Sequence, residues 1–108
     1  SKRHKFGVAP AEQRTCDGIV FASKKEMTRY GVLKLLASGG TISKLELQPK
    51  FDLHVNDTKV CSYVADFRYE EEGETIVEDV KSAPTKTPLY RLKKKMLKAE
   101  YGIEIRET

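Results

Sequence analysis

The chain has 108 residues, of which 39% are hydrophobic, and its 20 basic and 16 acidic residues give a net charge of +4. This length fits one domain with a modest core, and no apolar run approaches the roughly 20 residues of a membrane-spanning helix. The composition therefore excludes a membrane protein and predicts a soluble, cytoplasmic domain. The positive charge is compatible with a nucleic-acid partner but does not require one.

The cysteines and histidines offer little for a redox or zinc site. Cys16 and Cys61 lie far apart and form no CxxC pair, which indicates free thiols in a reducing compartment. His4 and His54 are the only histidines, so the number of ligands argues against a structural zinc site.

Residues 1–16 carry scattered basic charge and no sustained hydrophobic period, which predicts an irregular N-terminal arm before a domain over residues 17–108. The first helix is predicted over residues 24–38. In the segment FASKKEM, Ser23 followed by Glu26 has the spacing of a capping box, and two glycines follow the helix. At about 100° per residue, Glu26 shares the inner face of this helix with apolar residues, namely Tyr30, Leu33 and Ala37. A carboxylate on a buried face needs a partner.

Three strands are predicted to follow. The first covers residues 42–55 with a break or bulge at Pro49, the second covers 59–69, and the third covers 75–81 after a tight acidic turn. A second helix is predicted from Thr87, as N-cap, to Tyr101, with a buried stripe formed by Leu89, Leu92, Met96 and Ala99. Gly102 ends it, and residues 103–107 are predicted to form a last short strand. The order αβββαβ predicts an α/β domain with a mixed central sheet flanked by helices.

The acidic turn sets a register for the second and third strands. If Glu72-Gly73 forms the turn, then Asp66 lies directly opposite Asp79 on one face of the sheet. Lys81 follows two residues later and shares that face. Facing carboxylates repel, and a divalent metal ion bound between them is one way to compensate, because such ions prefer carboxylate oxygens.

Two alternatives to this pairing stay open. A turn that is one residue longer or shorter would bring Glu78 to the face of Asp66 instead. Alternatively, Asp79 forms an ordinary ion pair with Lys81 or Arg68 at a solvated edge of the sheet.

The order αβββαβ, the acid in "VADF" and the acid-x-Lys in "VEDVK" resemble the PD-(D/E)XK nuclease superfamily. More narrowly, the segments DGIVFASKKE, KLELQPKF, YVADF, VEDVK and YRLKKK resemble a small phage and prophage family of uncharacterised proteins placed in that superfamily. The resemblance implies a restriction-endonuclease-like core and a magnesium site formed by Glu26, Asp66 and Asp79, in which Mn²⁺ can replace Mg²⁺. It also implies that Lys81 contacts the attacking water or the scissile phosphate. The sequence departs from the superfamily pattern at Ala65, where a proline is usual, and in having Glu78 beside Asp79.

The resemblance therefore implies a metal-dependent endodeoxyribonuclease that hydrolyses phosphodiester bonds of DNA in phage DNA recombination or processing. Branched DNA, such as a junction, is a candidate substrate. Related small resolving enzymes are dimers, so it also implies a homodimer. Gln48 is a candidate contact to water or backbone, although a polar residue at a bulge explains it too. Basic residues of the second helix are candidate phosphate ligands or simply a solvated face: Arg91, Lys94, Lys95 and Lys98. The alternatives to an enzyme are a non-catalytic DNA-binding module and a phage structural or assembly protein.

Overall fold

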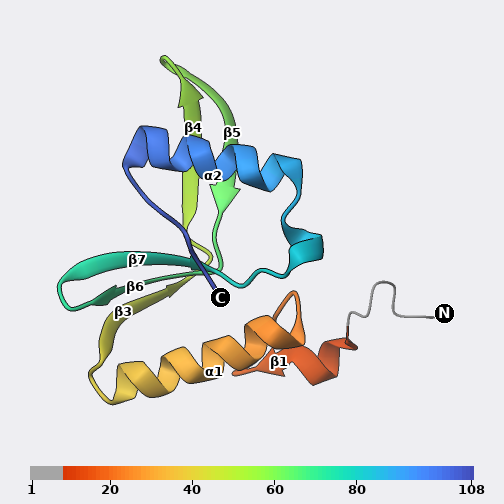
Figure 1. The fold of residues 1–108 in the computed structure, drawn as a ribbon. Coiled ribbons are helices and arrows are strands. Elements are labelled where there is room, and N and C mark those ends of the chain that lie inside the picture. The colour runs from red at the N-terminus through yellow and green to blue at the C-terminus, as the bar shows by residue number, and fades with distance from the viewer. Residues whose placement is uncertain (1–8) are drawn as a thin grey trace.

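The computed structural model describes residues 9–108 and contains a mixed four-stranded sheet between two helices (Figure 1). The strand order is β3-β6-β7-β8; β6 pairs antiparallel with β3 and with β7, and β8 lies parallel to β7. Together with the helices this sheet has the chain order αβββαβ, so the predicted α/β fold with a mixed sheet is confirmed. The elements are η2 Ala11–Arg14, β1 Thr15–Cys16, β2 Ile19–Val20, α1 Lys24–Ser38, β3 Ile42–Leu47, β4 Lys50–Val55, β5 Thr58–Val64, β6 Phe67–Glu71, β7 Glu74–Asp79, η3 Ala83–Thr85, α2 Pro88–Tyr101 and β8 Arg106–Glu107.

The predicted irregular arm contains regular structure in its second half. Residues 1–8 lie outside the described part of the chain, but η2 and β1 fall within the segment that was predicted to be irregular. Strand β1 pairs antiparallel with β2 through a turn at Asp17-Gly18, where both residues have positive φ angles. The prediction missed this hairpin because its strands have two residues each and leave no periodic signal.

Helix α1 begins and ends where the sequence predicts. The Ser23 side chain accepts a hydrogen bond of 3.1 Å from the Glu26 amide, and Gly39 follows the last helical residue. The buried residues of the helix are Glu26, Tyr30 and Leu33, as predicted from their spacing. Tyr30 and Leu33 belong to one apolar cluster with residues of β3, β6 and the segment before α1, and its buried members are Phe21, Tyr30, Leu33, Ile42, Phe67 and Tyr69.

Two of the predicted strands are each divided between two sheets. The segment 42–55 forms β3 and β4, and the segment 59–69 forms β5 and β6. Strands β4 and β5 pair only with each other, in a hairpin that projects from the four-stranded sheet (Figure 1). The chain passes from one sheet to the other at residues 48–49 and returns at residues 65–66, and these two crossings lie side by side. Gln48 N–H donates to Asp66 O at 3.0 Å, and Ala65 N–H donates to Pro49 O at 3.0 Å.

Helix α2 has the predicted bounds but a different buried face. Thr87 is the N-cap, and Gly102 follows the helix with φ +71°. Its buried residues are Tyr90 and Leu97, while Leu89 and Leu92 are 59% and 55% exposed. The predicted stripe is therefore wrong for Leu89, Leu92 and Ala99 and right for Met96, which is partly buried. The reason is that the helix packs over the β4–β5 hairpin with the Tyr90 ring against Tyr63. This second cluster lies on the face of the sheet opposite α1 and comprises Phe51, Leu53, Tyr63, Ala65, Val77, Tyr90, Leu97 and Ile105.

The last strand is shorter than predicted, and the described residues include no membrane-spanning helix. Only residues 106–107 of the predicted strand 103–107 pair with β7, although Ile105 is buried against the second cluster. Within residues 9–108, neither helix has the length and apolar content needed to cross a bilayer.

Candidate carboxylate site

The β6–β7 hairpin brings Asp66 and Asp79 together in the predicted register. Glu71 pairs with Glu74 and Phe67 with Glu78, so the next positions along the two strands are Asp66 and Asp79. The Asp66 amide donates to Asp79 Oδ1 at 2.8 Å, and the Val80 amide donates to Asp66 Oδ2 at 2.8 Å. Each aspartate therefore binds a backbone amide on the other strand, which holds the two carboxylates close together beyond the last strand pair.

Glu26 reaches the same place from the first turn of α1. The residue is 5% exposed, and burial raises the pKa of its carboxyl to about 7, with a further increase from the nearby charge of Asp66 and a smaller one from Asp79. Burial likewise raises the pKa of Asp66, and it raises the pKa of Asp79 to about 6. Three carboxyl groups from two separate parts of the chain thus resist ionisation together.

Gln48 also lies at this site, at the point where the chain passes from the four-stranded sheet into the β4–β5 hairpin. Its φ angle of +52° places it in the left-handed region, and it separates β3 from the start of β4. With Glu26 and Asp66 it lines a pocket of about 200 Å³ that is completed by Ile19, Val20, Phe21 and Leu47. The polar residue expected at a break in the strand therefore also lies beside two of the predicted site carboxylates.

Lys81 lies at the edge of the carboxylates, two residues after Asp79. Its positive charge lowers the pKa of Asp66 and of Asp79, although burial has the larger, opposite effect on both. The Lys81 ammonium sits 4.5 Å from the centroid of the Tyr90 ring, so α2 supplies a cation–π contact for it. The lysine is thus held between the two aspartates and α2.

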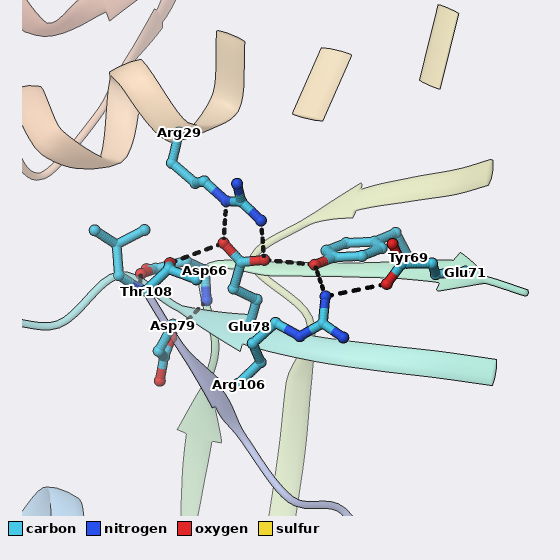
Figure 2. A network of polar contacts seen from close by, with 9 residues as sticks. Arg29, Asp66, Tyr69, Glu71, Glu78, Asp79, Arg106 and Thr108 are labelled. Atoms are coloured by element: carbon cyan, nitrogen blue, oxygen red, sulfur yellow. Dashed lines mark hydrogen bonds and ion pairs between the residues drawn. The ribbon is translucent and has the colours of Figure 1, made fainter. Parts of the chain in front are cut away.

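Glu78, the alternative acid, lies on the opposite side of β7. Figure 2 shows its side chain pointing toward Arg29 while the Asp79 side chain points the other way. Arg29 donates to both carboxylate oxygens of Glu78, at 2.5 and 3.0 Å, and Tyr69 and Thr108 donate at 2.5 and 2.9 Å. Burial alone would raise the pKa of Glu78, but these hydrogen bonds together lower it. The structure therefore places Asp79, and not Glu78, beside Asp66.

The carboxylate oxygens of this site are ligands of the type that a divalent cation needs. Asp79 Oδ2 is buried and has no hydrogen-bond partner among the described residues, so one carboxylate oxygen is available for a ligand. Carboxylate oxygens suit Mg²⁺ and Mn²⁺. Within residues 9–108, however, no group of three His, Cys, Asp or Glu side chains is already arranged around one point, and Asp66 and Asp79 each accept a hydrogen bond from a backbone amide. The residue types fit a cation, and their side chains would have to reorient to surround it.

Glu107 is a fourth carboxylate near the site, and it was not among the site residues predicted from the sequence. It pairs with Asp79 in the parallel β7–β8 ladder, and its negative charge contributes to the raised pKa of Asp79. Tyr90 Oη donates to Glu107 Oε2 at 2.6 Å, and this bond is the main cause that lowers the pKa of Glu107 to about 2. The only signal in the sequence is its spacing from Ile103 and Ile105, which continues their alternation.

The four basic residues predicted on the second helix come together around one cleft. The cleft has a volume of about 620 Å³ and lies between α2 and the segment 103–107. Two of the four residues are in ion pairs: Lys94 with Glu107 at 3.1 Å, and Lys98 with Glu104 at 2.8 Å. All four predicted residues line the cleft: Arg91, Lys94, Lys95 and Lys98.

Comparison with known proteins identifies the family. No curated protein and no solved structure shows a significant match to the chain. A family model described as "Protein of unknown function (DUF1064)" matches residues 3–108, which agrees with the prediction of an uncharacterised family. The match spans α1, the β6–β7 hairpin and α2, and the chain therefore belongs to this family of unknown function, DUF1064.

Proposed function

We propose that the protein is a metal-dependent endodeoxyribonuclease that hydrolyses phosphodiester bonds of DNA. The observation that carries this proposal is the grouping of Glu26, Asp66 and Asp79, all with raised pKa values, beside the Lys81 ammonium. The resemblance of the sequence to PD-(D/E)XK nucleases, in which residues of these types occupy these positions, supports it further. Carboxyl groups whose pKa values are raised together by burial and by neighbouring charges are typical of catalytic and ligand-binding sites.

Each residue of the site has a chemical role in this proposal. Glu26, Asp66 and Asp79 would hold Mg²⁺ or Mn²⁺, and Asp79 Oδ2 is a buried oxygen that has no hydrogen-bond partner among the described residues. A bound divalent ion supplies charge neutralisation at the phosphate and lowers the pKa of a bound water. The Lys81 ammonium would stabilise the negative charge that develops on the phosphate, and the Tyr90 ring keeps that ammonium beside the aspartates.

Gln48 and the basic cleft would bind the water and the DNA backbone next to the bond that is hydrolysed. Gln48 lines the pocket that Glu26 and Asp66 also line, and in this proposal it would orient a water molecule there. The basic residues of α2 would contact backbone phosphates, which position DNA without reading its sequence. Phosphate contacts of this kind also predict that the affinity for DNA falls steeply as salt is added.

Replacement of Asp79 by Asn is the sharpest test. Asp79→Asn keeps an oxygen for the Asp66 amide but loses the charge, so cleavage should fall by about 100-fold or more while the fold is preserved. Glu74→Gln is the matched control, because Glu74 lies on the same strand and is exposed. Both variants and the unaltered protein should be assayed with Mn²⁺, with Mg²⁺ and with EDTA on linear duplex, single-stranded and four-way-junction DNA.

The same assay separates the proposal from its alternative. An Asp79→Asn protein that cleaves as well as the unaltered protein would show that the site is misplaced. A non-catalytic DNA-binding module is favoured by one observation, namely that Asp66 and Asp79 both have backbone partners instead of surrounding one point. In that case the protein would bind DNA and cleave none of the three substrates with either metal.

A further inference from the structure

The cleft between α2 and the segment 103–107 has the composition of an anion-binding site. Five basic side chains line it, and two acidic ones lie among them. Tyr90, Ile103 and Ile105 supply its remaining surface, so the charged groups stand around a partly apolar floor. The cleft also borders the carboxylate site, because Tyr90 carries the Lys81 ammonium on its ring.

Three donors in this cleft converge on one carboxylate of the chain itself. Glu107 Oε2 accepts hydrogen bonds from Tyr90 Oη at 2.6 Å and from Lys94 Nζ at 3.1 Å, and Glu107 Oε1 lies 3.1 Å from Lys86 Nζ. The Glu107 side chain is 24% exposed, against 69% for Glu104 in its pair with Lys98 at the rim. Two ammonium groups and a hydroxyl surround the anionic oxygens of Glu107, and the same kinds of donor bind the oxygens of a phosphate group.

Two other cations of the cleft have no such partner. Within residues 9–108, no acidic side chain lies within ion-pair distance of Arg91 or Lys95, and both residues are exposed. These two side chains are therefore available to a polyanion at first encounter, whereas Lys86 and Lys94 share the carboxylate of Glu107.

We propose that this cleft binds a backbone phosphate of a nucleic-acid strand and that Glu107 occupies the phosphate position when no strand is bound. Glu107 acts as an internal counter-ion that the phosphate displaces from Lys86 and Lys94. The inference rests on the proposed function only in taking nucleic acid as the anion, and it does not require cleavage. Its consequence for the site is that a strand bound in the cleft would contact Tyr90, whose ring carries the Lys81 ammonium.

Removal of the Glu107 charge tests the inference by binding alone. Binding of a fluorescein-labelled oligo(dT) strand would be measured in EDTA across a salt series, so that no metal-dependent cleavage takes place. Glu107→Gln releases two lysines and should bind roughly fivefold more tightly, with a salt slope steeper by about one. Glu104→Gln makes the same change in net charge at the exposed pair with Lys98, and it should change the affinity by less than about twofold.

A second variant keeps the net charge constant. Glu107→Asp shortens the side chain and withdraws the carboxylate from Lys86 and Lys94, so it too should bind the strand more tightly than the unaltered protein. Equal gains for Glu107→Gln and Glu104→Gln, or no gain for either variant of Glu107, would overturn the inference. A gain specific to Glu107 in a protein that never cleaves DNA would uphold this inference while the proposed nuclease function failed.

Discussion

Replacement of Glu26 by Gln should make the protein more stable above pH 7 and change little at pH 4. The carboxyl of Glu26 is buried beside Asp66, and its pKa in the folded protein is about 7 compared with an ordinary value of 4.5. Ionisation of this group therefore opposes folding. Gln keeps the shape and the ability to hydrogen bond but carries no charge at any pH.

The sign and size of the effect follow from the two pKa values. Below pH 4.5 the group is protonated in both the folded and the unfolded chain, so its full contribution to stability is present. As the pH rises from 4.5 through about 7 the unfolded chain loses the proton first, and this contribution is lost. At about 1.4 kcal/mol per pKa unit, the loss amounts to about 3 kcal/mol, a large part of the stability of a small domain.

Urea unfolding at pH 4, 5.5 and 8 measures the effect. The unaltered protein should lose stability across this range, and Glu26→Gln should lose about 3 kcal/mol less of it. Some loss should persist in the variant, because the pKa of Asp79 is also raised, to about 6. Exposed Glu74→Gln should follow the unaltered protein at every pH. If Glu26→Gln were less stable than the unaltered protein at pH 8, the carboxyl would be ionised and well solvated, and the reasoning would be refuted.

Two further predictions concern the packing around the sheet. Leu97→Ala removes a fully buried side chain and should lower the free energy of unfolding by about 2–5 kcal/mol, whereas Leu92→Ala, at a position 55% exposed, should lower it by less than about 0.5 kcal/mol. Similar losses in urea unfolding would show that the helix packs by a different face. Arg29→Ala leaves the buried Glu78 carboxylate without its ion-pair partner and should cost about 3 kcal/mol, with Arg29→Lys in between. A loss of less than about 1 kcal/mol for Arg29→Ala in the same assay would contradict the importance of that pair.

The sequence was most informative where the structure depends on neighbouring residues. Ser23 and Thr87 predicted where the helices start, and Gly102 predicted where α2 ends, because caps act within one turn of the chain. The Glu72-Gly73 turn predicted the β6–β7 register correctly, because a two-residue turn fixes the pairing of the strands that it joins.

The sequence was least informative where distant segments meet. Residues 59–69 look like one strand, and the change of sheet at Ala65-Asp66 depends on Pro49 and Gln48, which lie far away in the chain. Asn56, with φ +54°, begins a turn that could have suggested the separate hairpin. Parallel pairing of β8 with β7 leaves no local signal, and for that reason Glu107 escaped notice.

The sequence predicted which residues of the candidate site lie near one another, but it did not predict how their side chains are hydrogen bonded. The two-residue spacing between Asp79 and Lys81 favoured Asp79 over Glu78 but left both open, and the face of α1 predicted the burial of Glu26. The hydrogen bonds of Asp66 and Asp79 to backbone amides could not be predicted, because they arise only where the two strands end together.

The paired crossings between the two sheets bear on how the length of this chain can vary over evolution. Residues 50–64 leave the four-stranded sheet and return to it at adjacent points, since Gln48 N–H meets Asp66 O and Ala65 N–H meets Pro49 O. An insertion whose two ends meet can grow or shrink at its far end without moving the segments that it interrupts. The far end here is the turn at Asn56-Asp57, so descendants of this gene can acquire longer or shorter hairpins while the carboxylates keep their places.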